Sequence, residues 1–312
     1  MRILITGGAG CLGSNLIEYW LPRGHALAVI DNFATGKREL VPATANLTLV
    51  EGTIADASTV EAAFASFGPQ VVIHAAASYK DPDNWQEDAA TNVLGSVNVA
   101  KACVAHGVGR LVNLQTALCY GRTSCVPIPV TQPVAPFTSY GITKTAGEQF
   151  VLASGVPTAS LRIANVTGPR LAIGPIPTFY KRLKAGQKCF CSATTRDFLD
   201  MEDFLALMDI MVAPDAPCGV FHASSGEGHT IREVFELVRV HLGLPEQEVP
   251  MVPPGGDDVA EVVLDASQTR MATGWTARVP FEAAIRRQLA WYDSFGVSTV
   301  HSHLAQPAGG IR

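Results

Sequence analysis

The chain has 312 residues, of which 47% are hydrophobic and 16% are charged, and its formal net charge is −5. This size is typical of one large domain or two coupled domains with a sizeable core. The net negative charge excludes a general attraction to nucleic acids or anionic membranes, and no run of eighteen apolar residues predicts a transmembrane helix.

The first residues enter a predicted strand without the features of a signal peptide, so we expect a cytoplasmic protein. Seven scattered cysteines, an odd number, favour reduced thiols over disulfides. Cys189 and Cys191 have no second ligand pair at zinc-site spacing, so we interpret them as buried thiols of one strand and expect no metal. His301 and His303 lie in a tail rich in Gly and Pro, where we expect solvated side chains.

The first half of the sequence alternates short apolar runs with amphipathic stretches. It predicts strands over residues 2–6, 26–32, 47–54, 70–77 and 110–120, and helices over residues 14–24, 57–68, 88–107 and 138–150. Strands rich in β-branched residues and separated by helices are typical of parallel pairing with crossover connections. We therefore expect an α/β fold with a doubly wound parallel sheet.

The second half is less regular. It predicts two more central strands, over residues 157–166 and 219–226, and two helices, over residues 231–244 and 280–296. We expect the chain to leave its first domain near Asn165, to return briefly, and to leave again near Gly226.

The predicted helix over 88–107 is apolar around most of its circumference. Its apolar positions include Val93, Leu94, Val97, Val99, Ala100, Cys103 and Val104. One such face is expected to meet the sheet, and the second needs another cover. Either a fully internal helix or a dimer interface accounts for this pattern.

A glycine motif joins the first predicted strand to the first predicted helix. Three glycines of TGGAGCLG, namely Gly7, Gly10 and Gly13, stand three residues apart. Small residues let the backbone approach phosphates, and a helix N-terminus supplies N–H groups and a positive dipole. Asp31, which ends the next strand, is placed to accept hydrogen bonds from ribose hydroxyls and to repel a 2′-phosphate. The motif predicts a dinucleotide and favours NAD over NADP, with Lys37 or Arg38 as alternative contacts for a phosphate.

A second motif, TSYGITK, places Tyr140 and Lys144 four residues apart at the start of a predicted helix, so both project from one face. Tyrosine is a poor base at neutral pH because its reference pKa is about 10, and a nearby ammonium group lowers that pKa. Thr116 ends a predicted strand, at the edge where α/β folds place their active sites. These three residues are the predicted catalytic group, although a chance Tyr-x-x-x-Lys pair is common in helices.

Together with HAAA, Asn92, LRIANVTGPR and RDFLDMEDF, these motifs resemble the extended short-chain dehydrogenase/reductases, in particular nucleotide-sugar epimerases and dehydratases similar to UDP-glucose 4-epimerase. The resemblance spans nearly the whole chain. It implies an NAD-binding Rossmann domain over residues 1–165, with a return at about 198–226. It also implies a smaller C-terminal domain for a nucleotide-diphosphate sugar, over residues 166–197 and 227–312, and homodimers through a four-helix bundle.

The resemblance also implies which residues contact each ligand. For NAD, they are Gly7, Gly10, Cys11, Leu12, Gly13, Asp31, Asn32, Phe33, Gly36, Thr53, Ile54, Ala75, Ala76, Ala77, Lys80, Asn92, Tyr140 and Lys144. For the substrate, they are Thr116, Tyr140, Asn165 and Arg196. The alternative for Arg196 is a structural ion pair with Asp197 or Asp200.

The family's shared step is oxidation at carbon 4 of the sugar. The resemblance implies that Tyr140 would take the hydroxyl proton and that Thr116 would stabilise the developing carbonyl. It also implies that Lys144 would hold the nicotinamide ribose. Dehydratases of the family carry an acid or base next to the threonine, where this chain has Ala117 and Leu118, which hold no titratable proton. The resemblance therefore predicts a 4-epimerase, with a dehydratase or a net oxidoreductase as alternatives. A non-catalytic NAD-binding regulator is disfavoured because the tyrosine–lysine pair is retained.

Two positions depart from the family's pattern. Pro254 stands where similar epimerases carry an arginine that contacts the diphosphate, which puts UDP binding in question. Glu261 lies near the position that sets the pocket size, which favours a sugar with an unusual polar or cationic group.

Overall fold

The computed structural model describes residues 1–79 and 81–297. Its main sheet has seven strands, all parallel, in the order β3-β2-β1-β4-β5-β6-β10. The strands are β1 (Arg2–Thr6), β2 (Ala26–Asp31), β3 (Leu47–Glu51), β4 (Val71–His74), β5 (Arg110–Thr116), β6 (Thr158–Ile163) and β10 (Gly219–Ala223). The predicted doubly wound α/β fold is confirmed.

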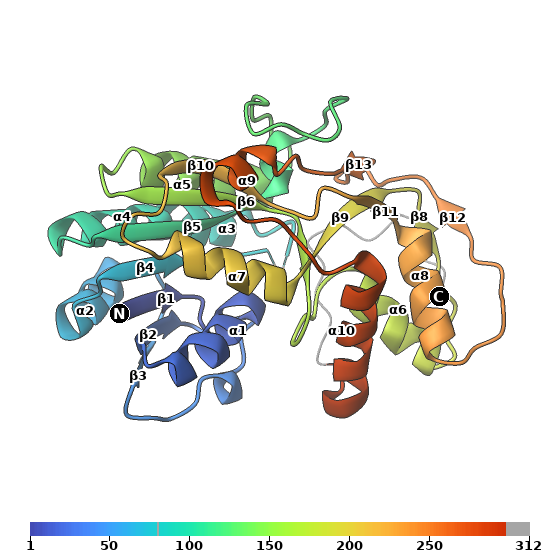
Figure 1. Ribbon diagram of the computed structural model, residues 1–312, viewed down its shortest axis with the longest axis horizontal. Coiled ribbons are helices and arrows are strands. Elements are labelled where there is room, and N and C mark those ends of the chain that lie inside the picture. The colour runs from blue at the N-terminus through green and yellow to red at the C-terminus, as the bar shows by residue number, and fades with distance from the viewer. Residues whose placement is uncertain (80, 298–312) are drawn as a thin grey trace.

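Helices cover both faces of this sheet (Figure 1). One face packs against α1 (Cys11–Trp20) and α7 (Met201–Met211), and the other against α2 (Ala57–Phe67), α4 (Gly95–Ala105) and α5 (Ser139–Leu152). The sequence of β1 is continuously apolar because both faces of this strand are buried. Ile3 and Ile5 point toward α1 and α7, whereas Leu4 points toward α2 and α4.

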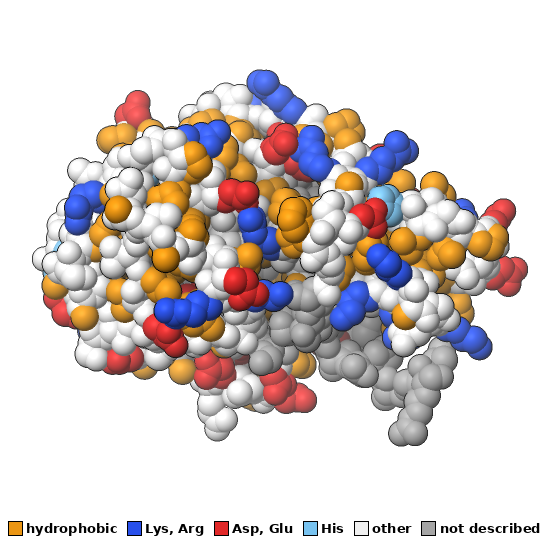
Figure 2. Space-filling model, turned by 90° about the horizontal axis from the view of Figure 1, so that it is seen from below, with side chains coloured by type: hydrophobic (Ala, Val, Ile, Leu, Met, Phe, Trp, Pro, Cys, Tyr) orange, Lys and Arg blue, Asp and Glu red, His pale blue; other side chains and the backbone are white. Residues whose placement is uncertain are grey.

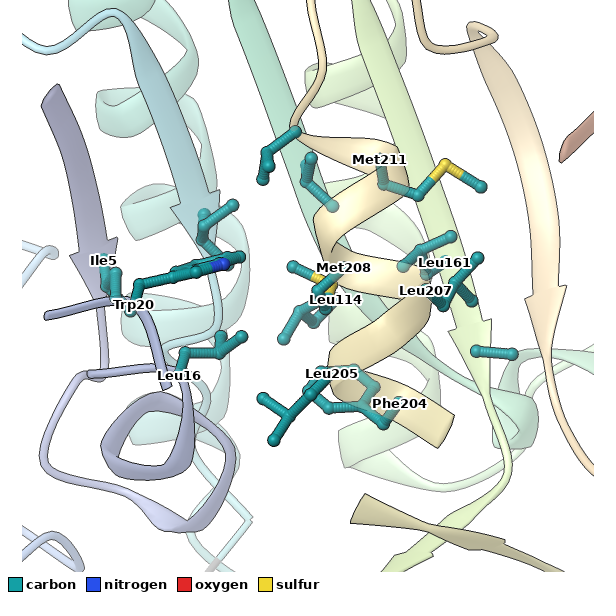
Figure 3. Close-up of a cluster of buried hydrophobic side chains, with 14 of the residues drawn as sticks. Ile5, Leu16, Trp20, Leu114, Leu161, Phe204, Leu205, Leu207, Met208 and Met211 are labelled. Atoms are coloured by element: carbon teal, nitrogen blue, oxygen red, sulfur yellow. The ribbon is translucent and has the colours of Figure 1, made fainter. Parts of the chain in front are cut away.

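The core under α1 and α7 fixes the two helices relative to the sheet. Trp20 is fully buried and lies near Leu114 of β5 and Met208 of α7 (Figure 3). Burial of each such side chain contributes about 1.5–3 kcal/mol to folding. The indole N–H of Trp20 also donates to the carboxylate of Asp209 at 2.6 Å, which joins α1 directly to α7.

Several predicted boundaries are wrong. Strand β3 ends at Glu51, and β10 is an edge strand instead of a central one. Strand β5 ends at Thr116, as expected for that residue, but the rest of the apolar run forms a 3₁₀ helix η4 (Ala117–Tyr120). The first helix begins at Cys11, because the glycine turn is its N-terminus, and it ends at Trp20 before a 3₁₀ turn η1 (Leu21–Arg23).

The predicted helix over 88–107 is divided. A short α3 (Trp85–Asp88) is followed by a π-helical turn η3 (Ala89–Leu94) and then by α4. Val99 and Cys103 are buried against the sheet, whereas Leu94 and Val104 are 49% and 56% exposed. Within this chain the helix is therefore not fully internal.

The other elements form a second lobe beside the sheet (Figure 1). It contains β7 (Asn165–Thr167), α6 (Pro175–Lys184), β8 (Cys191–Ser192), β9 (Thr195–Asp200), β11 (Gly228–Thr230), α8 (Ile231–His241), β12 (Met251–Val252), β13 (Glu261–Val262) and α10 (Phe281–Phe295). Strand β9 is central, since it pairs with β7, β11 and β13. Between these segments the chain re-enters the main lobe through α7, β10 and α9 (Ser267–Thr273).

The cysteine prediction is half correct. Cys191 is buried on β8, but Cys189 precedes that strand and is only partly buried. All seven thiols are free, and the described residues contain no cluster of His, Cys, Asp or Glu that would hold a metal. His301 and His303 lie outside the described residues.

No helix among residues 1–79 and 81–297 is long and apolar enough to cross a bilayer. On the face in Figure 2, basic and acidic side chains are interspersed.

Candidate active site

The predicted site residues gather at the carboxyl ends of the main-sheet strands. Thr6, Asp31, His74 and Thr116 are the last residues of β1, β2, β4 and β5, which are parallel and share one edge. This is the edge where open α/β sheets bind their ligands.

The glycine turn after β1 leaves no room for side chains. Gly7 has φ +70°, and a Cβ there would lie 2.7 Å from the Cα of Ala76. A Cβ at Gly13 would lie 2.5 Å from the carbonyl oxygen of Gly7, so the turn packs directly on its own helix. Gly10 is the N-cap of α1 and brings no side chain over the first N–H groups. This bare helix N-terminus fits the pyrophosphate of a dinucleotide.

Asp31 is held in place by the same turn. Its carboxylate accepts the N–H groups of Ala9 and Phe33, each at 2.8 Å. Burial raises the pKa of Asp31, and these two hydrogen bonds oppose that rise. The carboxylate keeps further lone pairs for the hydroxyls of a ribose.

The loop after Asp31 runs back against the turn. Asn32 accepts the N–H of Ala34 at 3.1 Å, and Phe33 has φ 56°. A Cβ on Gly36 would lie 2.8 Å from that of Ala9, so this loop has close contact with the glycine turn.

The two basic residues that follow have acidic partners. Arg38 lies 2.5 Å from Glu51, and Lys37 lies 3.9 Å from Glu39. This pairing supports the preference for NAD over NADP.

Of the remaining residues predicted to contact NAD, some lie at the carboxyl edge of the sheet and others lie on α1. Thr53 and Ile54 follow β3, and Ala75, Ala76 and Ala77 follow β4, all at the same sheet edge. Leu12 lies in the first turn of α1 and packs on the core, while the Cys11 thiol donates to the carbonyl of Pro169 at 3.5 Å. Burial raises the pKa of Cys11 to about 12, so this thiol is not a reactive thiolate. Lys80 lies outside the described residues.

Asn92 is held by side chains and backbone of its own chain. Its amide donates to the carbonyl of Ser78 at 3.0 Å and to the hydroxyl of Thr143 at 3.1 Å, and its Oδ1 accepts the N–H of Ser78 at 2.8 Å. Asn92 is buried and connects the segment after β4 to α5.

Thr116, Tyr140 and Lys144 are brought together as predicted. The side chain of Thr116 lies close enough to the Tyr140 hydroxyl to lower its pKa. Lys144 is buried one helical turn beyond Tyr140, and its Nζ donates to the carbonyl of Leu114 on β5 at 2.7 Å. The N-cap Thr138 accepts the N–H of Gly141 at 3.1 Å and so begins α5 just before the tyrosine.

The expected lowering of the tyrosine pKa is wrong for this structure. Burial raises the pKa of Tyr140, nearby Tyr79 and Asp88 add to the rise, and the side chain of Thr116 opposes it. Burial also lowers the pKa of Lys144 to about 8, against the attraction of Glu148. Sequence spacing placed the pair on one helix face but did not reveal that both groups are desolvated.

A buried polar network beneath the site was missed. Arg162 of β6 donates to Glu148 of α5 at 2.9 Å and to the hydroxyl of Tyr120 at 2.9 Å. Tyr120 in turn lies 2.5 Å from His222 of β10. The position of Glu148 four residues after Lys144 was the available signal, but its partners come from distant strands.

Two of the predicted substrate residues, Asn165 on β7 and Arg196 on β9, lie in the second lobe. Asn165 is exposed and donates to the carbonyl of Asp197 at 3.0 Å. Arg196 is paired at 2.5 Å with Asp258, so neither Asp197 nor Asp200, the expected alternatives, is its partner.

A cleft of about 610 Å³ lies between the loop after Tyr120 and the segment after β12. Pro254 and Glu261, the two departures from the family's pattern, line it together with Arg122 and Asp258. The Arg122 guanidinium lies 4.1 Å above the ring of Phe137 and donates to the carbonyl of Gly256, so it bridges the two walls.

A model of the NAD dependent epimerase/dehydratase family matches residues 3–219. The chain belongs to this family. The predicted resemblance to extended short-chain dehydrogenase/reductases is therefore confirmed, and so is NAD as the cofactor, with which solved relatives were crystallised.

Three similar proteins show the range of similarity. The UDP-glucose 4-epimerase of Corynebacterium glutamicum is 31% identical over 88% of this chain and 91% of its own. The Bordetella bronchiseptica enzyme WbmG, solved with NAD and UDP, is 64% identical over 98% of this chain and 99% of its own, with a TM-score of 0.94. The Thermotoga maritima UDP-glucose 4-epimerase, solved with UDP-glucose, is 27% identical with a TM-score of 0.86 and covers 94% and 99%.

Proposed function

We propose that this enzyme is an NAD-dependent 4-epimerase of a UDP-sugar. The observation that carries the proposal is the proximity of Thr116 and Tyr140 at the end of β5, with the buried Lys144 one helical turn beyond Tyr140 and no titratable side chain at the two positions after Thr116. The UDP in the WbmG structure and the names of the epimerase relatives support the nucleotide.

In this mechanism, Tyr140 accepts the proton of the sugar 4-hydroxyl, and the hydroxyl of Thr116 donates a hydrogen bond to the oxygen that becomes the carbonyl. The Lys144 ammonium stabilises the phenolate that the buried site otherwise disfavours. NAD, which the glycine turn after β1 and the Asp31 carboxylate would hold, would supply hydride transfer at carbon 4 when bound.

Ala117 and Leu118 support epimerisation over dehydration. Ala117 is buried in a small apolar cluster with Ile128, Val262 and Leu264, and Leu118 packs against it. The positions next to Thr116 therefore serve packing, and they supply no acid or base for carbon 5 or carbon 6. A dehydratase or a net oxidoreductase is the alternative within the family.

The second lobe is proposed to bind the nucleotide sugar. The cleft lined by Arg122 and Glu261 lies between the main-lobe loop after Tyr120 and segments of this lobe. Because Arg196 is already paired with Asp258, we do not assign it to the diphosphate.

We further propose a homodimer through α4 and α5, which pack side by side. Their outer faces carry Val104, Ile142 and Phe150, which are 56%, 49% and 52% exposed, and Leu94, the last residue of η3 just before α4, is 49% exposed. A second copy would remove these apolar side chains from water.

The reaction is tested by incubating the enzyme with a panel of UDP-sugars in deuterated water and following the products by NMR and mass spectrometry. We expect a 4-epimer of unchanged mass, with no deuterium at carbon 5 and no net consumption of NAD. Loss of one water, or deuterium at carbon 5, would assign the enzyme to the dehydratases.

A further inference from the structure

The 3₁₀ helix η4 connects the two groups of the proposed proton transfer. Where it begins, the hydroxyl oxygen of Thr116 accepts the N–H of Leu118 at 3.1 Å, which fixes the orientation of the threonine side chain. Further along, η4 packs on the first turn of α5, because a Cβ on Gly141 would lie 3.1 Å from the carbonyl oxygen of Leu118. That turn of α5 carries Tyr140. A shift of η4 would therefore disturb Thr116 and Tyr140 together.

Tyr120, the last residue of η4, is buried and is held by two strands. Arg162 of β6 donates to its hydroxyl oxygen at 2.9 Å, and that oxygen lies 2.5 Å from Nε2 of His222 on β10. Nδ1 of His222 lies 2.8 Å from the carbonyl oxygen of Asp265. Because a carbonyl oxygen only accepts, Nδ1 carries the imidazole hydrogen and Nε2 accepts the hydrogen of the Tyr120 hydroxyl.

These partners leave the Tyr120 hydroxyl a single orientation, since Arg162 can only donate to it and neutral His222 can only accept from it. Arg162 is itself fixed, because its Nη2 and Nε donate to the buried carboxylate of Glu148 at 2.9 and 3.3 Å. Glu148 lies on α5, one helical turn beyond Lys144. A chain of buried hydrogen bonds thus joins the helix that carries Tyr140 to the end of η4.

We propose that Tyr120 is a positioning residue for the reaction: its hydroxyl fixes η4 and thereby keeps the Thr116 side chain beside the hydroxyl of Tyr140. Tyr120 is buried, so it acts through Thr116 and not on the substrate itself. This role rests on the proposed function, in which Thr116 and Tyr140 meet the 4-hydroxyl of the sugar.

The decisive variant is Tyr120→Phe, which keeps the ring and removes the hydroxyl. We expect kcat on the best UDP-sugar to fall about 10- to 100-fold, because a misplacement of about 1 Å at a catalytic group can cost about 100-fold. The KM for the sugar and the dissociation constant for NAD should stay within about twofold of the wild type, since the lost alignment matters in the transition state.

Tyr180→Phe is the matched control. Tyr180 of α6 is also buried, and its hydroxyl accepts from Lys184 at 3.0 Å and donates to Asp293 at 2.6 Å, within the second lobe. We expect this variant to lose stability in urea unfolding and to keep the wild-type kcat. An unchanged kcat in Tyr120→Phe, or an equal fall of kcat in both variants, would overturn the positioning role. A fall of kcat/KM that comes from KM alone would overturn it as well.

The same experiment separates this role from the proposed function. A dehydrated product from the wild-type enzyme would refute the epimerase assignment. The comparison of kcat between Tyr120→Phe and the wild type would still decide the role of Tyr120, because oxidation at carbon 4 by Thr116 and Tyr140 precedes both outcomes. A 4-epimer formed equally fast by Tyr120→Phe and the wild type would refute the positioning role alone.

Discussion

At the scale of single residues, Tyr140 combines two opposed properties. Its phenol lies beside Thr116, at the position expected of a base, yet burial raises its pKa. A phenol of this kind is a useful base only while a positive charge lies close by. Lys144 is the buried cation on the same helix, and it points at the carbonyl of Leu114.

Tyr140→Phe should abolish turnover while NAD binding and the fold persist. Only the proton-transfer group is removed, and loss of a general base costs about two to four orders of magnitude in rate. Steady-state kinetics on the best UDP-sugar, with the bound NAD measured after denaturation, checks this. Turnover near the wild-type rate would remove Tyr140 from the mechanism.

Because Lys144 is a buried cation, we expect kcat/KM to depend on pH. Burial lowers the pKa of Lys144 to about 8, so this cation is present below that pH and is lost as the pH rises through it. At saturating NAD we expect kcat/KM to fall on the alkaline side with a midpoint near pH 8. Lys144→Arg keeps its charge at these pH values, because the arginine pKa exceeds about 12. In this variant the alkaline fall should disappear, whatever its absolute rate, and a midpoint that stays near pH 8 would contradict the assignment.

Among elements, α5 has the most direct effect on the site, because its first turn carries Tyr140. The N-cap Thr138 satisfies the N–H of Gly141 in that turn. Thr138→Ala should reduce the free energy of unfolding by about 0.5–2 kcal/mol and should also lower kcat, since the turn that holds Tyr140 loosens.

Thr230→Ala is the matched control for this cap. Thr230 caps α8 in the second lobe with a reciprocal bond to Glu233. Urea unfolding should show a similar loss of stability in both variants, while kcat falls only in Thr138→Ala. Equal kcat values in the two variants would mean that the cap contributes stability alone.

The elements also show what the sequence could predict. The strands β1, β2, β4, β5 and β6 follow from apolar, β-branched runs, because they are buried on both faces. Local patterns do not specify an edge position, which depends on which strands pair, so β10 was wrongly expected to be central. The π-helical turn η3 and the parallel pair β8–β12 depend on distant packing and have no local signature.

The candidate site likewise has residues that a local sequence pattern predicts and residues whose contacts depend on distant parts of the chain. The glycine turn, Asp31, Thr116, Tyr140 and Lys144 were predictable because steric and chemical needs restrict each to one residue type at a given spacing. The pairing of Arg196 with Asp258 joins residues 62 positions apart, and the Arg162–Tyr120 bond joins residues 42 apart. Such pairs require knowledge of the folded chain.

For the whole molecule, the outer face of α4 and α5 predicts a dimer. We expect light scattering to give twice the chain mass for the wild type. Val104→Glu combined with Phe150→Glu places two charges where a second copy would pack, so we expect this variant to be a monomer. Met271→Glu, at a position 77% exposed on α9, is the control and should remain dimeric. A monomeric wild type would contradict the proposed interface.

The two lobes are interwoven, and this restricts how substrate range can be exchanged between relatives. The chain passes between lobes after β6, β9, β10, β13 and α9. In a hybrid enzyme that changes from one parent's sequence to the other's after β6, α7 would come from the foreign parent along with the second lobe. The residue at position 209, which accepts the Trp20 hydrogen bond in this chain, would then also be foreign. Recombination that preserves the native sheet must instead transplant residues 165–200, 228–262 and 281–295 together and leave α7, β10 and α9 with their original chain.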